Sequence, residues 1–119
     1  MQAKRFTYPR ESRLLTPRNF SFVFEQAIPA TSNTITILAR HNELDHPRLG
    51  ITVPKKKVKL AVNRNRLKRC MRESFRLNAH SLPNVDIIII AKHGINELDN
   101  KQLYAQLDSL WRRIKKRCT

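Results

Sequence analysis

The stretch that decides the fold is Lys55–Arg76, KKKVKLAVNRNRLKRCMRESFR. It holds ten of the chain's 24 lysines and arginines and only one acid, Glu73. A disordered basic tail would lack apolar periodicity, but here the less polar side chains fall along one side of a helix drawn at about 100° per residue. These are Leu60, Asn63, Leu67, Cys70, Met71 and Ser74, with Phe75 and Leu77 just beside them. We therefore predict an ordered helix that begins between Lys57 and Val62, docks on a core through this stripe, and ends before Ser81.

The cations of this helix fall on the neighbouring side of the same projection. Arg64, Lys68, Arg72 and Arg76 recur at four-residue intervals, with Asn65 and Arg69 beyond them. An ordinary solvated face would interleave acids at i+4 for mutual support, and only one acid is present. We expect the charged groups to project into solvent as a ladder that suits a row of phosphates.

The overall charge points to the same kind of partner. Twenty-four bases against nine acids give a formal charge of +15 on 119 residues. A small fold tolerates that self-repulsion most easily when a polyanion neutralises it, so nucleic acid is the first partner to consider. No segment approaches the roughly 20 apolar residues of a membrane span, and the N-terminus has charges where a signal peptide needs apolar residues. We expect a cytoplasmic protein with no membrane partner.

The length fits one domain, residues 1–119, in which residues 1–13 form an extended basic arm, and the charge makes nucleic-acid binding its expected role. Two cysteines without CxxC spacing predict neither a disulfide nor a zinc site, and Cys70 is most simply a small core residue. The four histidines, His41, His46, His80 and His93, show no ligand pattern. We expect no cofactor bound by the protein.

The remaining elements alternate around the basic helix. Thr16-Pro17 starts a short helix that stops before Pro29, and Asp99, with Gln102 three residues later, caps the last helix. Strands are predicted over 28–31, 34–40, 48–53 and 85–91, the last a continuous apolar run at the centre of the sheet and parallel to the strand before the basic helix. The fold class is α+β, an α-β-β-β-α-β-α sandwich with one mixed sheet, and general rules favour a right-handed crossover around the basic helix.

The first helix carries an unusual aromatic load. Phe20, Val23 and Phe24 share one face, while Phe22 points elsewhere. Paired aromatics at this spacing are usually core, but they can also stack unpaired bases at about 1 to 3 kcal/mol per base. Both interpretations remain open at this point.

No catalytic constellation is visible. The acids are scattered, there is no nucleophile-base pair, and with only Gly50 and Gly94 the chain lacks the material for a glycine-rich phosphate loop. A protein-based nuclease is unsupported, so any chemistry belongs to a partner.

The segment RNRLKRCMRESFR, residues 64–76, has the spaced pattern RNRxKRxxRExFR and resembles the signature of the bacterial ribonuclease P protein family, proteobacterial type. PRESRLLTPRNFSFVFEQ, ITILAR, HPRLGITVPKK, DIIIIAKHG and LDSLWRR follow in that family's order and spacing, so the resemblance covers nearly the whole chain. It implies a small basic subunit that joins a catalytic RNA to remove the 5′ leader of precursor tRNA. It also implies the ribosomal protein S5 domain 2-like fold with a left-handed βαβ crossover, in place of the right-handed default.

The resemblance implies site residues as well. The catalytic RNA would contact the basic helix and the segment before it, namely Arg64, Asn65, Arg66, Lys68, Arg69, Arg72 and Arg76, with Lys55 and Lys56. A leader-binding cleft would lie between the first helix and the sheet, at Phe20, Phe24, Thr36 and Leu38, the last replacing an aromatic found in some members. Mg²⁺ would be held by the RNA and the substrate, and the protein would be monomeric, one copy per RNA.

Two other classes of protein remain as alternatives. A ribosomal or other structured-RNA-binding protein without a role in cleavage would have similar charge. A helix-turn-helix regulator of DNA would need a second helix three or four residues before the basic one, where a strand is predicted over Leu49–Val53. DNA regulation is therefore the poorer alternative.

Overall fold

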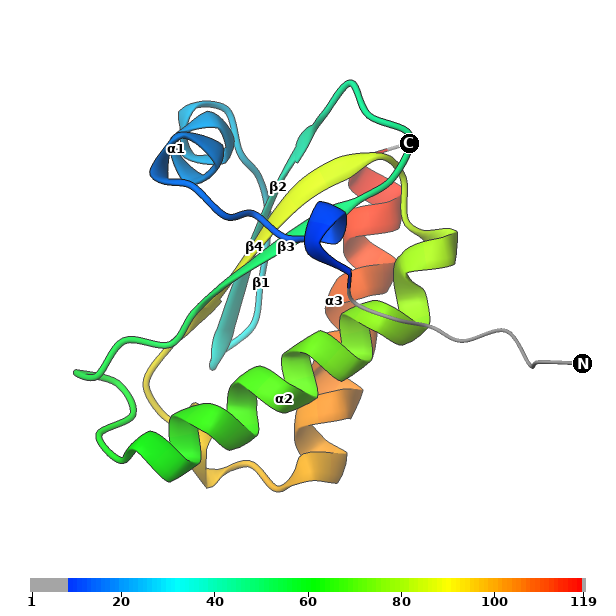
Figure 1. Cartoon of the computed structure of the whole chain (residues 1–119). Coiled ribbons are helices and arrows are strands. Elements are labelled where there is room, and N and C mark those ends of the chain that lie inside the picture. The colour runs from blue at the N-terminus through cyan, green and yellow to red at the C-terminus, as the bar shows by residue number, and fades with distance from the viewer. Residues whose placement is uncertain (1–8, 119) are drawn as a thin grey trace, which may run out of the picture.

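The computed structural model of the chain describes residues 9–118 (Figure 1). Its helices and strands follow the predicted order: α1 Pro17–Glu25, β1 Ile28–Thr31, β2 Ile35–His41, β3 Arg48–Thr52, α2 Ala61–Asn78, β4 Val85–Ala91 and α3 Asn100–Arg117. Short 3₁₀ turns occupy Arg10–Ser12, Ala79–Ser81 and Ile95–Glu97. The α+β class is confirmed.

The four strands form one mixed sheet in the order β1-β2-β4-β3. β2 pairs antiparallel with both β1 and β4, whereas β3 and β4 are parallel and are joined by α2. β4 is an inner strand, as its apolar run predicted, and Ile87, Ile88 and Ile89 are all fully buried.

The two faces of the sheet are covered by different helices, as Figure 1 shows: α2 and α3 lie on one side and α1 on the other. Ile87 and Ile89 belong to the larger core with α2 and α3, and Ile88 belongs to a smaller cluster with Val23 of α1. This alternation follows from the two-residue period of a strand. In the larger core the Trp111 indole N–H donates to the buried Ser74 hydroxyl at 2.8 Å.

The predicted stripe of α2 is confirmed in its middle and wrong at its start. Leu67, Cys70, Met71, Ser74 and Phe75 are buried. Leu60 is 62% exposed because it precedes the helix as the N-cap residue, so the helical projection does not apply to it. Leu77, beside the stripe, is also exposed.

The caps of α1 and α3 form reciprocal hydrogen bonds. Thr16 and Asn19 form one capping box, and Asp99 and Gln102 form the predicted second one. Residues 1–8 of the predicted arm lie outside the described residues. The rest of it is folded: Arg10–Ser12 form a turn, and Arg13 makes a parallel bridge to Leu49 of β3.

Candidate nucleic-acid interface

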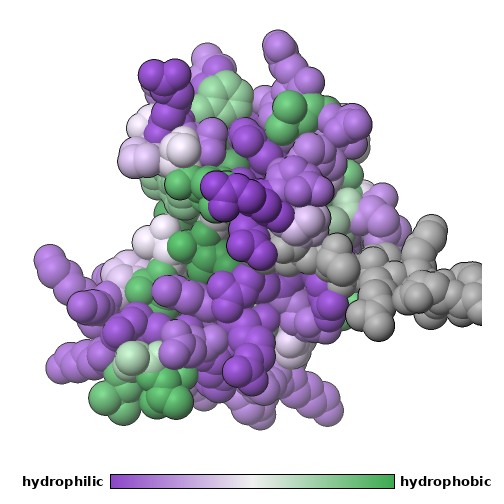
Figure 2. All heavy atoms as spheres, viewed as in Figure 1, coloured by the Kyte–Doolittle hydropathy of each residue, from purple (hydrophilic) through white to green (hydrophobic). Residues whose placement is uncertain are grey.

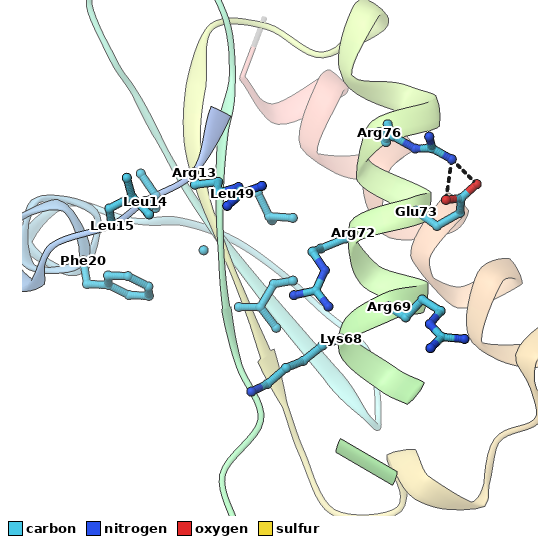
Figure 3. Close-up of a pocket in the computed structure, with 12 residues that line it drawn as sticks. Arg13, Leu14, Leu15, Phe20, Leu49, Lys68, Arg69, Arg72, Glu73 and Arg76 are labelled. Atoms are coloured by element: carbon cyan, nitrogen blue, oxygen red, sulfur yellow. Dashed lines mark hydrogen bonds and ion pairs between the residues drawn. The ribbon is translucent and has the colours of Figure 1, made fainter. Parts of the chain in front are cut away.

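An open groove of about 690 Å³ lies between α2 and the edge strand β3. Figure 3 shows Lys68 and Arg72 pointing from α2 toward β3, with Phe20 of α1 on the far side of that strand. Arg13, Leu14 and Leu15 form part of the same lining. The groove therefore has a mostly cationic wall on α2, which also carries Glu73, and a mostly apolar wall formed by α1 and the segment before it, which also carries Arg13.

Several of the predicted RNA-binding residues have no internal partner. Within the described residues we find no hydrogen bond or ion pair from the side chains of Lys55, Lys56, Asn65, Lys68, Arg69 and Arg72. Lys68 and Arg72 line the groove together, and Arg69 lies at its margin, pointing away from β3 (Figure 3). Cations without acid partners keep their full charge for an anionic ligand.

Arg64, a member of the expected ladder, and Arg66, an RNA contact implied by the resemblance, both bond to the protein itself. The Arg64 guanidinium donates to the carbonyls of Val58 and Lys59 at 3.0 and 2.8 Å, bracing the loop before α2. Arg66 donates to Asn100 Oδ1 and to the Leu98 carbonyl at 2.7 and 3.1 Å, tying α2 to the start of α3. The helical projection gave their side of the helix, but it could not show that long arginines reach neighbouring backbone.

Arg76 is also engaged, because its guanidinium pairs with Glu73 one turn earlier. Its charge is partly offset by the one acid of this helix. Of the four residues expected as a ladder, Lys68 and Arg72 remain without partners among residues 9–118.

The ring of Phe20 lies directly over Gly50 of β3. A Cβ built on Gly50 would stand 2.6 Å from Phe20 Cζ, closer than atoms can approach. The absence of a side chain at residue 50 thus lets an aromatic ring pack against the strand and face the groove. Gly50 was missed as a site residue, since a glycine within a strand shows only that something approaches closely.

The four predicted cleft residues share one side of the sheet but differ in exposure. Phe20 and Leu38 pack against the small cluster of Leu14, Val23 and Ile88. Thr36 is half-buried on β2, and Phe24 is 54% exposed. Phe20 lines the groove beside α2, whereas the other three are not part of its lining.

The segment before α1 is held in place by two contacts. The Leu14 N–H donates to the Leu49 carbonyl at 3.0 Å, and His46 Nε2 lies 2.8 Å from the Glu11 carbonyl. Asp45 beside the imidazole raises the pKa of His46 above its ordinary value, with help from the Glu11 carbonyl. These contacts place Arg13 at the groove, which the sequence pattern did not indicate.

Metal and membrane sites were searched in the same part of the chain. Across residues 9–118 no three His, Cys, Asp or Glu side chains gather in a way that would hold a metal ion. None of the helices described is long and apolar enough to cross a membrane.

The geometry defines a class: a basic α+β protein whose groove joins unpaired cations to a partly exposed aromatic side chain, Phe20, the combination that binds nucleic acid. Comparison with known proteins makes this specific. The family model described as Ribonuclease P matches residues 8–115. The ribonuclease P protein component of Pseudoalteromonas atlantica is 54% identical over 94% of this chain and 93% of its own. That of Pectobacterium atrosepticum is 55% identical over 92% of both.

Solved structures agree. A Staphylococcus aureus RNase P protein mutant with defective mRNA degradation activity superposes with a TM-score of 0.84 at 27% identity, covering 89% of this chain and 90% of that one. The RNase P protein of Thermotoga maritima gives 0.77 at 34% identity, covering 86% and 96%. The chain belongs to the ribonuclease P protein family, whose members are components of the tRNA-processing ribonuclease P. Its partner is accordingly the RNA of that ribonucleoprotein.

Proposed function

We propose that α2 binds the catalytic RNA of ribonuclease P through its unpartnered cations, and that the groove beside α2 guides the 5′ leader of precursor tRNA. The observation that carries the proposal is the pairing of Lys68 and Arg72 on one wall of the groove with Phe20 on the other. Phosphates meet the cations, and an unpaired base meets the aromatic face.

The predicted RNA-binding residues divide into two roles under this proposal. Lys55, Lys56, Asn65, Lys68, Arg69 and Arg72 contact RNA directly, because no internal partner competes for them among the described residues. Arg64, Arg66 and Arg76 hold protein groups and present their remaining donors to the RNA. Truncation of Arg64 or Arg66 therefore weakens RNA binding partly by releasing the loop before α2 or the start of α3.

The leader path uses the α1 side of the sheet. In this proposal the leader path begins with Phe20 at the groove. The exposed Phe24 extends the path along α1, over Thr36 and Leu38. Stacking on an aromatic ring tolerates any base, which suits leaders of varied sequence.

The protein supplies binding and orientation, and the RNA supplies catalysis. Mg²⁺ would be held by the RNA and the substrate rather than by this protein, and it would supply the activation of water for the hydrolysis. One protein binds one RNA in the cytoplasm, and the precursor tRNA is the shared substrate.

Reconstitution tests this proposal. The purified protein is mixed with the catalytic RNA at a magnesium concentration too low for the RNA alone, and 5′-leadered precursor tRNA is added. We expect cleavage at the mature 5′ end only when both components are present. Magnesium-dependent 5′ processing by RNA-free protein that survives nuclease treatment would contradict the division of labour.

A further inference from the structure

The start of α2 carries an exposed apolar surface that folding does not explain. Leu60 and Val62 are 62% and 69% exposed, more than the other exposed large hydrophobic side chains, Leu15, Phe24, Leu44 and Leu77. Ala61 between them is exposed as well. Figure 2 shows a hydrophobic patch over the start of α2, surrounded by hydrophilic surface. We call Leu60, Ala61 and Val62 the apolar pad.

The pad breaks a local rule of helix formation. Leu60 is the N-cap residue of α2 and makes no side-chain cap hydrogen bond. Serine, threonine, asparagine or aspartate at this position would satisfy a free N–H of the first turn. Large apolar residues in its place neither cap the helix nor join the core, and such exceptions concentrate at functional sites.

The segment just before the pad is held in place by burial and hydrogen bonds. Val58, two residues before it, is buried, and the N–H groups of Lys57 and Val58 both donate to the Pro54 carbonyl. Arg64 then holds the carbonyls of Val58 and Lys59. A surface fixed in this way loses little conformational freedom when a partner covers it.

A hollow adjoins the pad. It has a volume of about 400 Å³ and lies between residues 56–60 with Asn63 and the loop at residues 93–97. Leu60 forms part of its lining, and the side-chain amide of Asn63, also in the lining, makes no hydrogen bond within the described residues. The hollow thus offers an apolar surface and a polar group able both to donate and to accept.

The charges around the pad indicate the kind of partner that it would bind. Lys55, Lys56 and Lys59 are exposed and, among residues 9–118, their side-chain ammonium groups have no hydrogen-bonded or ionic partner. A polyanion with apolar surface of its own fits this combination, and RNA provides both, since unstacked bases expose apolar faces beside a phosphate chain. The pad is also continuous with the α2 face already assigned to RNA.

We propose that the apolar pad packs against an unstacked base of the catalytic RNA, with that base in the hollow beside Leu60 and Asn63. This inference rests on the proposed function and makes it more specific. The N-terminal end of α2 contacts a base of the catalytic RNA, and the Lys68–Arg72 region contacts phosphates of the same RNA.

The test compares a Leu60→Ser/Val62→Ser double variant with Leu77→Ser. Leu77 lies at the other end of α2 and is 45% exposed, so it controls for loss of an exposed apolar side chain from the same helix. Binding to the catalytic RNA is measured over a series of salt concentrations. We expect the double variant to lose about tenfold to a hundredfold in affinity with an unchanged salt slope, because no cation is removed. Leu77→Ser should bind as the wild type does.

Binding to a uniform RNA duplex of similar length distinguishes contacts with unstacked bases from contacts with the RNA backbone. Its bases are stacked and hidden, so the double variant should bind it as tightly as the wild type does. The unfolding midpoint should stay the same or rise, since serine at residue 60 can cap α2. A gain in stability with a loss in binding is a result that a structural role would not give.

Three results would overturn the inference: wild-type affinity of the double variant for the catalytic RNA, an equal loss on the duplex, or a fall in the unfolding midpoint. Loss of binding to phosphatidylglycerol vesicles with RNA binding intact would also overturn it, in favour of an anionic membrane. If the wild type itself showed no salt-dependent affinity for the catalytic RNA, the proposed function would fail instead.

Discussion

Phe20 and Phe24 show how two aromatic residues on one short helix come to differ. Phe20 is fixed between Gly50 and the small cluster, so it belongs partly to the core. Phe24 is one turn further along and 54% exposed, so its ring has little to do with stability. The spacing predicted their common face, but only the position of α1 on the sheet decides which ring is covered.

Phe24→Ala is therefore the cleaner test of leader binding. We expect affinity for leadered precursor tRNA to fall by about 1 to 3 kcal/mol, with no change for mature tRNA and little change in the unfolding midpoint. Leu44→Ala, which removes another exposed apolar side chain, is the control. If Phe24→Ala lowers stability and leaves the preference for leadered RNA intact, Phe24 is structural and the leader path does not include it.

Asp86 is a buried charge inside an otherwise apolar strand. It is 0% exposed, and its carboxylate accepts from Arg48 Nε and Nη2 at 2.8 and 2.7 Å and from Asn42 Nδ2 at 2.9 Å. The same bonds raise the pKa of Arg48 above its usual value. Sequence reasoning treated this strand as an apolar run, because the partners of Asp86 are distant in the chain.

Truncating one member of this pair should be costly. Asp86→Ala leaves Arg48 without its acid, and we expect a loss of about 3 to 5 kcal/mol in the free energy of unfolding, measured by urea denaturation. Asp108→Ala, at an exposed acid on α3, should change stability by less than about 0.5 kcal/mol. Equal stability of the two variants would show that the Arg48–Asp86 pair does not organise this end of the sheet.

At the scale of elements, both edge strands of the sheet have backbone acceptors that are bonded by other parts of the chain. The Arg113 guanidinium donates to the Thr31 carbonyl at 3.0 Å, and Arg117 donates to the Pro29 carbonyl, so α3 occupies acceptors of β1. The segment at Arg13 and Leu14 bonds to Leu49 on β3. Covered edges protect a sheet from pairing with other chains. This role of the basic end of α3 depends on contacts remote in sequence, so the sequence pattern did not indicate it.

The segment before α1 is held by a histidine, His46, whose pKa is raised by its hydrogen bonds to Asp45 and to the Glu11 carbonyl. Protonated His46 donates from Nδ1 to Asp45 and from Nε2 to the Glu11 carbonyl, which raises its pKa in the folded state, while burial and Arg48 oppose this. A group whose pKa is raised on folding stabilises the fold fully below its unfolded pKa of about 6.5, and loses that contribution as pH rises through the folded value.

His46→Ala should therefore destabilise the protein more at about pH 5.5 than at about pH 8.5. The measurement is the difference in unfolding free energy between the variant and the wild type at both pH values. His93→Ala, at an exposed histidine outside this contact, is the control. A difference that grows with pH, or does not change, would contradict the role given to His46.

α2 shows how far an element can be predicted. The period of 3.6 residues identified Leu67, Cys70, Met71 and Ser74 as buried, because a helix fixes the angle between its residues; Phe75, predicted just beside this stripe, is buried as well. The same projection failed at Leu60, where the helix had not yet begun, and it could not show that the long side chain of Arg64 reaches other backbone groups. Burial along α2 could be predicted where helix geometry alone determines it. Contacts with residues distant in the sequence could not be predicted in this way.

Across the part of the molecule that the structure describes, the cationic side chains fall into two groups, those bonded to the protein itself and those without an internal partner. Arg48, Arg64, Arg66 and Arg113 hold acids or carbonyls of the protein. Lys68, Arg69 and Arg72 hold none within residues 9–118 and lie together at the groove. The formal charge of +15 predicted a polyanionic partner, but only the fold separates structural cations from those left for RNA.

The order of elements was predictable, since each strand and cap has a local pattern, but of the strand pairing only the inner position of β4 and its parallel pairing with β3 were predicted. The resemblance to the ribonuclease P protein family supplied the RNA partner, which charge alone leaves open. The groove was not predictable, because it requires Gly50, Phe20 and the segment at Arg13 to meet α2. The handedness of the crossover through α2 stays a prediction from that resemblance.

The most direct test of the account measures the affinity of the wild type and of Lys68→Ala/Arg72→Ala for the catalytic RNA as salt is varied. Each phosphate contact contributes about 0.7 to 0.9 to the slope of log affinity against log salt, so the double variant should bind more weakly with a slope lower by nearly two. Arg112→Ala, at an exposed cation on α3, should leave the slope unchanged. Wild-type affinity and slope in the double variant would remove this face of α2 from the RNA interface and contradict the account.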